Sequence, residues 1–215
     1  MSSSMLFRIS LITLALLVGC YGLLSGAAEL AAATRPALPA DPRTPTQLGE
    51  APSWPGGIPF FRSDLENNHA LIEALHAIRD GKASADSDHA RSRAISALSV
   101  KPYDAELWLT LALFETRRDP NGPAVVGALK MAYITGANDA RLMPLRLYTA
   151  TSADALFDLE LAELARGDVR LILTRRPELK ATLVQAYRRA SKQGKSFLEE
   201  AVQAVDASFL GALRS

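Results

Sequence analysis

The sequence predicts an all-α protein, and three observations support this prediction. Only 7% of the 215 residues are aromatic, and no long run of alternating β-branched residues, the pattern typical of strands, occurs. From residue 63 onward, apolar residues recur three and four positions apart, which places them on one face of a helix. Proline and glycine interrupt this pattern repeatedly, so we expect several helices joined by short turns.

The longest apolar stretch stands at the start of the chain. Between Ile9 and Ala28 no residue is charged, and at about 1.5 Å per residue a helix of this length spans the core of a bilayer. Arg8 precedes the stretch and Glu29 follows it, which favours a cytoplasmic N-terminus. We therefore predict that residues 1–30 are a single-pass anchor in a bacterial inner membrane, with the soluble domain in the periplasm.

A lipid anchor is the alternative for the same stretch. Residues 17–20, Leu-Val-Gly-Cys, resemble a bacterial lipobox, in which the leader is removed and the thiol of Cys20 is acylated. The chain stays apolar over residues 21–24, where lipoproteins usually become polar. Cleavage after a small residue such as Ala33, as in a secretory leader, is a third possibility. All three place the remaining chain on the same side of the membrane.

Residues 31–62 are expected to form a linker between the membrane and the helices. The prolines in this segment are Pro36, Pro39, Pro42, Pro45, Pro52, Pro55 and Pro59. Their spacing excludes a helix and favours an extended chain, so the linker can hold a domain tens of ångströms from the bilayer. Its apolar residues, Trp54, Ile58, Phe60 and Phe61, could instead dock on the helices or on a partner.

Two helices are expected next. The first covers residues 64–80 and has Asp64 as its N-cap. The second can be capped by Asp86 or Ser87, and it ends before Pro102 because the residue preceding a proline avoids helical angles. The apolar face of the first helix contains Leu71, Ile72, Leu75 and Ile78.

A tight pair of helices follows. Asp104 is the expected N-cap of the first, which ends in the polar residues 117–119. Residues 120–123 contain two prolines and a glycine, and they break the chain before a helix over residues 124–135. Gly136 closes that helix, since glycine is typical of the position that follows a helix end.

The remaining chain predicts further helices. Capping side chains, and a proline suited to a first turn, indicate where three of them start. These residues are, in order, Asn138 or Asp139, Thr151 or Ser152, and Pro177. Gly167 is expected to break the second of the three, leaving residues 169–176 as a short buried segment, and Gly194 is expected to separate the last two helices.

Residues 90–136 contain a repeated pattern of small and apolar side chains. Trp108, Leu111 and Ala112 have the spacing Trp-x2-Leu-Gly, with alanine in place of glycine. The other positions of the pattern are Ala90, Ala94, Ala97 and Pro102, and Ala124 and Ala128 follow the first two at one constant interval. This pattern and its interval resemble the tetratricopeptide repeat, a helix–turn–helix unit of about 34 residues.

The resemblance implies a fold for residues 63–215: antiparallel helix pairs in a right-handed stack, with a concave groove for peptides or partner proteins. Three positions depart from the pattern, since Glu115 stands where the family has tyrosine, Met131 where it has alanine and Gly136 where it has proline. An ordinary bundle of alanine-rich helices is the alternative, because about three repeats are needed for a stable array.

One group of side chains has the spacing of a metal site. His69, Glu73 and His76 are separated by four and three residues, so they share a helix face and could hold a divalent cation. They lack the His-Glu-x-x-His arrangement of zinc proteases. Incidental histidines on a solvated face are the simpler interpretation, and we expect neither a metal nor a cofactor.

Arginines gather near the C-terminus. Arg175, Arg176, Arg188 and Arg189 could form a basic cluster for an anionic polysaccharide, lipid head groups or an acidic partner. They could equally be solvated arginines at helix ends, where a positive charge favours the last carbonyl groups.

Several function classes are disfavoured by the sequence. A net charge of +1 gives no electrostatic basis for nucleic-acid binding. No glycine-rich phosphate loop, Gly-x-Ser-x-Gly motif or zinc-protease motif occurs, so we expect no enzymatic activity and no small-molecule ligand.

The anchor, the linker and the repeats together predict a membrane-tethered adaptor. It would bind protein partners during assembly of the cell envelope, for example in the synthesis or export of a surface polysaccharide. The alternative is an accessory subunit whose membrane helix pairs with a larger enzyme or transporter, because Gly19, Gly22 and Gly26 permit close helix packing.

Overall fold

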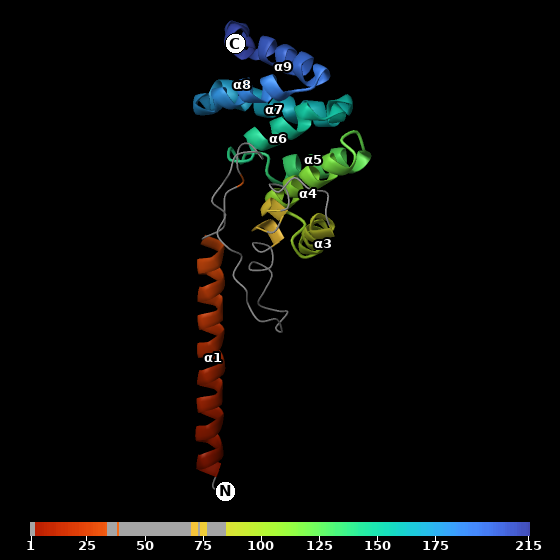
Figure 1. The fold of residues 1–215 in the computed structure, drawn as a ribbon. Helices are drawn as coiled ribbons and strands as arrows, with labels where there is room; N and C mark the ends of the chain where they lie inside the picture. Colours follow the sequence, from red (N-terminus) through yellow and green to blue (C-terminus); the bar gives the residue numbers. More distant parts are fainter. Residues whose placement is uncertain (1–2, 34–37, 39–69, 73, 77–84) are drawn as a thin grey trace.

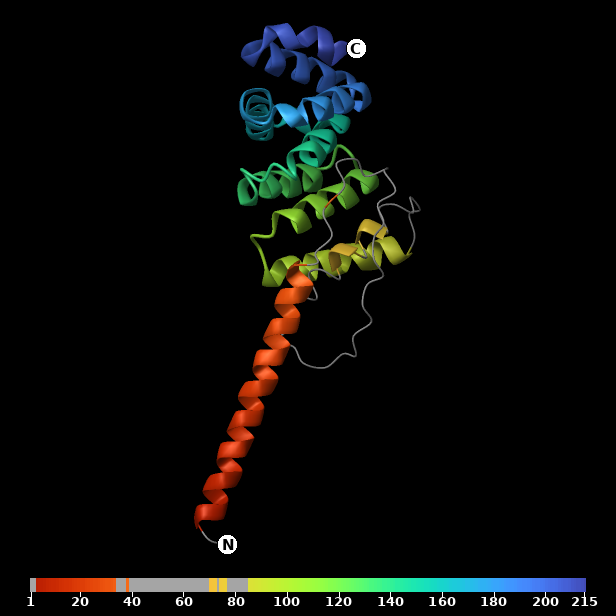
Figure 2. The same cartoon turned by 90° about the vertical axis from the view of Figure 1, so that its left-hand side faces the viewer.

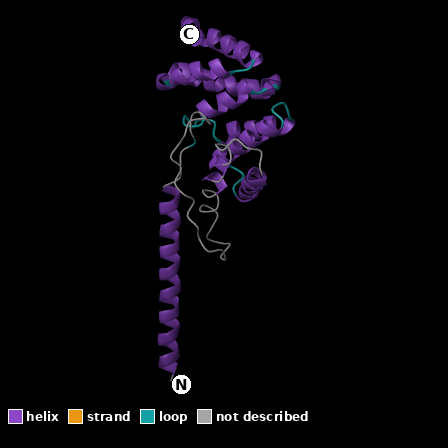
Figure 3. Cartoon of the chain, in the orientation of Figure 1, coloured by secondary structure: helices purple, strands orange, loops and turns teal. Residues whose placement is uncertain are grey.

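A computed structural model of the 215-residue chain describes residues 3–33, 38, 70–72, 74–76 and 85–215. Within these ranges the protein is helical and contains no strand (Figures 1 and 3). This confirms the all-α prediction. Most of the predicted linker lies outside the described residues, and so do His69 and Glu73.

The N-terminal helix α1 covers Ser3–Ala33. Its segment Phe7–Ala27 has a mean hydropathy of 2.0 and is long and apolar enough to cross a membrane. None of this segment is buried against the rest of the protein. The hydroxyl of Thr13 donates to the carbonyl oxygen of Ile9 at 2.9 Å, which satisfies a polar group that hydrocarbon would leave without a partner. The prediction of one apolar helix near the N-terminus is confirmed.

The helices that follow are stacked in chain order (Figures 1 and 2). They are α3 (Ala85–Val100), α4 (Ala105–Arg118), α5 (Pro123–Thr135), α6 (Met143–Ser152), α7 (Leu159–Arg175), α8 (Lys180–Arg189), α9 (Lys192–Val205) and α10 (Leu210–Arg214). From α4 onward, each helix contacts the next one and the one after that. Consequently α4, α6 and α8 form one row of neighbours, and α5, α7 and α9 form a second row.

One hydrophobic core runs through the stack. It includes small residues at helix contacts, such as Ala112, Ala132 and Ala165, each with no exposed surface, because small side chains let helix axes approach closely. The described residues 70–72 and 74–76 are helical, in agreement with the first predicted helix, and Leu71 and Leu75 are buried in the same core. The linker residue Leu38 is buried there as well.

The start of α4 is as predicted. One carboxylate oxygen of Asp104 accepts the N–H groups of Glu106 and Leu107, both at 3.1 Å, which satisfies two donors that have no partner inside the helix. The indole N–H of Trp108 donates to the carbonyl oxygen of Pro102 at 2.7 Å. The turn between α3 and α4 is therefore fixed from both sides.

Gly136 ends α5 for a reason other than the predicted one. Its φ is −125°, so it does not use the left-handed conformation that makes glycine common after helices. A Cβ atom at this position would lie 2.7 Å from the Cβ of Ala105. The glycine is needed because the end of α5 and the start of α4 approach each other closely.

The predicted break at Gly167 is wrong, because α7 continues from Leu159 to Arg175 as one helix. The buried residues of α7 keep helical spacing across the glycine, including Ala165 before it and Val169 and Ile172 after it. Their burial outweighs the cost of one glycine in a helix interior, about 1 kcal/mol. Residues 169–176 are consequently not a separate segment.

Gly194 does not separate two helices either. It is the third residue of α9, and its N–H donates to the Ser191 hydroxyl at 3.1 Å, which makes Ser191 the N-cap. A Cβ atom on Gly194 would lie 2.1 Å from the carbonyl oxygen of Thr151. The same oxygen accepts the N–H of Ser191 at 2.9 Å. Glycine therefore lets the first turn of α9 contact the end of α6.

Helices α6 and α7 start later than predicted. Residues 136–142 form turns, and the Asp139 carboxylate accepts the N–H of Arg141 at 3.0 Å instead of capping a helix. Residues 151–152 belong to the end of α6, and Asp158 is the N-cap of α7, accepting the N–H of Leu161 at 2.9 Å. Short 3-10 turns cover Asp154–Phe157, Pro177–Leu179 and Ala207–Phe209. The last of these follows the end of α9 at Val205, so the predicted final helix is two helices.

Candidate functional site

The repeat-pattern residues are concentrated in the contacts between α3, α4 and α5. Those in the core are Ala90, Ala94, Ala97, Leu111, Ala112 and Ala128. Trp108 is half-buried, and Pro102 is exposed in the turn before α4. Ala124 is exposed in the first turn of α5, although Ala90, at the matching position one repeat earlier, is buried. The pattern thus marks helix packing and contains no group that could bind a ligand by itself.

The residues considered for a metal site are only partly described. His76 is half-buried on its helix, whereas His69 and Glu73 lie outside the described residues. Among the residues whose positions are given, no group of three or more His, Cys, Asp and Glu side chains is arranged to hold a metal ion. Cys20, the possible lipidation site, is exposed on α1 as a free thiol.

The four C-terminal arginines do not lie together. Arg175 is in the last turn of α7 and Arg176 directly follows it, whereas Arg188 and Arg189 form the last turn of α8. The ten residues of α8 separate the two pairs, a distance of about 15 Å along the helix axis. All four are exposed, and three lie in the last turn of a helix, where a positive charge is favourable.

A buried ion pair that the sequence did not reveal lies between α5, α6 and α7. Arg146 of α6 has no exposed surface, and Asp168 of α7 is 2% exposed. Nη2 of Arg146 donates to Oδ1 of Asp168 at 2.9 Å, and Nε donates to Oδ2 at 3.2 Å. Two parallel hydrogen bonds of this kind fix the relative position of both side chains.

The rest of the Arg146 guanidinium is engaged by α5. Nη1 donates to the carbonyl oxygens of Gly136 at 2.6 Å and Ala132 at 3.3 Å, which lie at the end of that helix, where carbonyl groups lack partners within the helix. The guanidinium carbon lies 4.6 Å from the centre of the Tyr133 ring, a cation–π geometry. One side chain of α6 thus binds the end of α5 and the middle of α7.

Burial shifts the proton affinity of this group. The pKa of Asp168 is raised to about 7 because burial disfavours the carboxylate, and the charge and hydrogen bonds of Arg146 oppose this rise. Burial also raises the pKa of Tyr133 well above its ordinary value, with the Asp168 charge adding to the effect. Both partners of the ion pair are closed to solvent, so we interpret the pair as a connection between helices and not as a binding site.

A comparison with known protein families, with curated proteins and with solved structures gives no match for this chain.

Proposed function

We propose that this protein is a membrane-tethered adaptor of the bacterial cell envelope whose helical domain is a tetratricopeptide-like stack that binds other proteins. The observation behind the proposal is the combination of two rows of stacked helices with an exposed apolar helix at the N-terminus. Such a stack presents a long surface built from successive helices, which suits recognition of an extended partner. Assembly of the envelope, for example the synthesis or export of a surface polysaccharide, is the proposed setting.

The contacts between helices support the tetratricopeptide-like part. The most extensive helix contact is between α4 and α5, the two helices that hold most of the repeat pattern, and a short turn joins them. Contacts between alternate helices continue through α6, α7, α8 and α9. In a repeat array each unit packs on its neighbours in this way.

The repeat period also continues in part beyond α5. Leu145 follows Leu111 by one period and Ala162 follows Ala128, and all four side chains are buried. One period after Ala112, however, comes Arg146. A guanidinium replaces a small side chain at this helix contact, and Asp168 then supplies the charge that its burial requires. This substitution accounts for the weak repeat signal after residue 136.

Isolation of the full-length protein from its native membranes tests the proposal. Cells are cross-linked, the protein is purified through a C-terminal tag, and mass spectrometry identifies its N-terminus and the proteins attached to it. We expect an intact Met1 and a defined envelope complex. If no protein copurifies specifically, the adaptor function is wrong. Protease treatment of spheroplasts should cleave the helical domain, and full protection would exclude the periplasmic location.

A second candidate function is that of an accessory subunit held to a membrane enzyme or transporter by α1. Gly19, Gly22 and Gly26 share one face of this helix, and a Cβ atom on any of them would meet nothing within 4 Å. Another membrane helix could therefore approach the backbone closely. Replacement of residues 3–33 by an unrelated membrane helix distinguishes the two functions: an adaptor keeps its partners, whereas an accessory subunit loses them.

A further inference from the structure

Exposed arginines flank a tyrosine in the row formed by α4, α6 and α8. Arg117 and Arg118 end α4, Tyr148 lies in α6, and Arg188 and Arg189 end α8. The four arginines are exposed and Tyr148 is half-buried. We refer to these five residues as the Tyr148 face.

Interactions across the row place these residues near one another. The guanidinium carbon of Arg189 lies 6.0 Å from the centre of the Tyr148 ring. Partial burial lowers the pKa of Arg117, and an electrostatic interaction with Tyr148 opposes this change, so Arg117 is also within reach of the tyrosine. Helix α6 contacts both α4 and α8. Positive charges from two helices therefore converge on one aromatic side chain of the helix between them.

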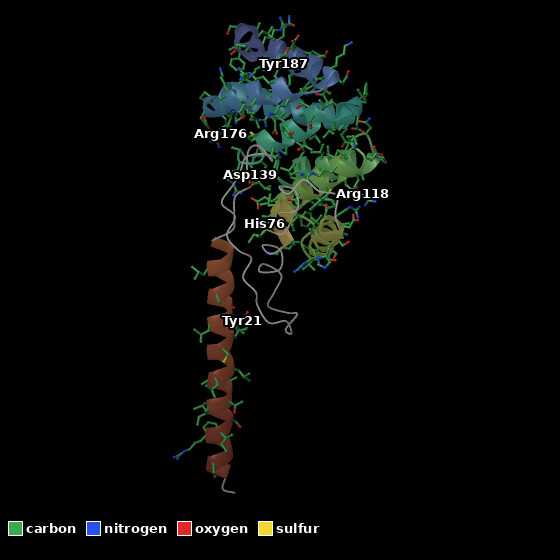
Figure 4. All side chains as sticks on the ribbon, viewed as in Figure 1. Tyr21, His76, Arg118, Asp139, Arg176 and Tyr187 are labelled. Carbon is green, nitrogen blue, oxygen red and sulfur yellow. The ribbon has the colours of Figure 1, made fainter. Side chains whose placement is uncertain are left out.

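The direction of the helices separates this face from the other arginines. Figure 4 shows Arg118, at the end of α4, on one side of the stack, and Asp139 and Arg176 on the opposite side. Asp139 precedes α6 and Arg176 precedes α8, so both helices begin on the side away from the end of α4. The ends of α4 and α8 consequently carry their arginines on the same side.

Acidic side chains close to this face in the chain already have partners. Glu115 accepts a hydrogen bond from Nε of Arg91 at 2.6 Å and is buried. Asp119, at the C-terminal end of α4, accepts the N–H of Asn121 at 3.2 Å. The local charge of the Tyr148 face is therefore strongly positive, although the whole chain has a net charge of only +1.

We propose that the Tyr148 face is the docking surface for an acidic polypeptide segment of a protein partner. This proposal rests on the proposed adaptor function and specifies the kind of partner. Neighbouring helix axes are about 8–10 Å apart, so an extended chain that rises about 3.3 Å per residue crosses from α4 to α8 in roughly six residues. Its carboxylates would form paired hydrogen bonds with the arginines. The tyrosine between them offers an apolar ring with a polar hydroxyl.

A polypeptide fits this arrangement better than a membrane surface does. The charges lie at two ends of a narrow track across three helices, with Tyr148 between them. An extended chain can follow such a track, whereas a membrane contacts a broad plane.

The test compares two double variants with equal changes of charge. Arg117→Glu with Arg189→Glu alters the Tyr148 face, and Arg175→Glu with Arg176→Glu alters the opposite side of the stack. Purified full-length protein in detergent is titrated into a fluorescent peptide that contains six glutamates, and anisotropy reports binding. We expect the first variant to weaken binding at least tenfold and the second less than twofold. Equal binding by the wild type and both variants would overturn the proposal.

Further arms of the experiment distinguish the kinds of anionic ligand and the two proposals. Polygalacturonate or vesicles with anionic lipids that bind more tightly than the peptide, with the same loss in the first variant, would overturn the polypeptide assignment. Circular dichroism melting confirms that both variants are folded. Cross-linking in the native host is repeated with each variant. A partner retained equally by all of them leaves the adaptor function intact and refutes the Tyr148 face, whereas no partner even for the wild type refutes the adaptor function itself.

Discussion

The guanidinium of Arg146 interacts with three helices at once. It pairs with Asp168 of α7, donates to the carbonyl groups of Ala132 and Gly136 at the end of α5, and covers the Tyr133 ring. Removing two charges from water is costly, and this cost is offset only when nearly every donor has a partner. The net stabilisation from the pair is therefore modest, but the loss of either member leaves a buried charge alone.

Removal of one member of the pair should be far more damaging than removal of both. We expect Arg146→Met to lower the free energy of unfolding by about 3–5 kcal/mol, and the double variant with Asp168→Leu to recover most of this loss. The measurement is urea unfolding of the full-length protein in detergent at pH 8, followed by circular dichroism. Tyr133→Phe is the control, because it keeps the ring beneath the guanidinium. Additive effects of the two substitutions would contradict this account.

The stability of the protein should depend on pH through Asp168. Its pKa is about 7 in the folded chain and about 3.9 when unfolded, so the folded state binds a proton more tightly. This contribution to stability is complete below about pH 4 and is lost as the pH rises through 7. We expect the wild type to lose stability between pH 4 and pH 7.5 relative to Asp168→Asn, which cannot titrate. A constant difference between the two proteins over this range would show that the carboxyl stays ionised.

At the level of single helices, two glycines have opposite roles that the sequence does not distinguish. Gly167 lies within α7, and a Cβ atom there would meet nothing within 4 Å. Gly194 lies within α9, where a Cβ atom would overlap the backbone of Thr151. The first glycine only weakens its helix, whereas the second permits a helix contact.

Alanine at these two positions should therefore change stability in opposite directions. We expect Gly167→Ala to raise the free energy of unfolding by about 0.5–1 kcal/mol, because alanine has the higher helix propensity. Gly194→Ala should lower it by about 2 kcal/mol or more, because α9 must move away from α6. Thermal unfolding of both variants under identical conditions measures the difference. A stabilising Gly194→Ala would mean that the ends of α6 and α9 are not in contact.

The sequence predicts helices well where local chemistry determines them. Asp104 has the side chain that caps a helix, and the apolar spacing after it fixes the buried face of α4. Helix bounds fail where a distant contact decides, as at Gly194, whose partner Thr151 belongs to α6 and is far away in the chain.

The site-level contacts were harder to predict for the same reason. Arg146 and Asp168 are far apart in the chain, and in the sequence each resembles an exposed charge among apolar neighbours. The only available signal was a charged residue between Leu145 and Leu147 in an apolar stretch, at the position one repeat after Ala112. The arginines of the Tyr148 face are similarly assembled from helices that are distant in the sequence.

At the scale of the whole molecule, the apolar α1 and the helical stack have different relations to solvent. The stack buries its apolar residues in one core, whereas the large apolar side chains of α1, such as Leu14, Leu16 and Leu17, are more than half exposed. Exposure of so many adjacent apolar side chains to water is unfavourable by about 25 cal/mol for each Å². A bilayer removes this cost, which is the physical basis of the proposed tether.

A charge in the middle of α1 should therefore release the protein from the membrane. We expect Leu14→Arg to reduce the fraction that resists carbonate extraction, because an arginine within the bilayer core costs about 2.5–3.5 kcal/mol on insertion scales. Leu30→Arg, beyond the apolar span of Phe7–Ala27, is the matched control and should have no effect. Cys20→Ala should also remain membrane-bound, since a spanning helix does not need the thiol. If Cys20→Ala releases the protein, acylation and not the helix attaches it, and the pairing of α1 with another membrane helix is then excluded.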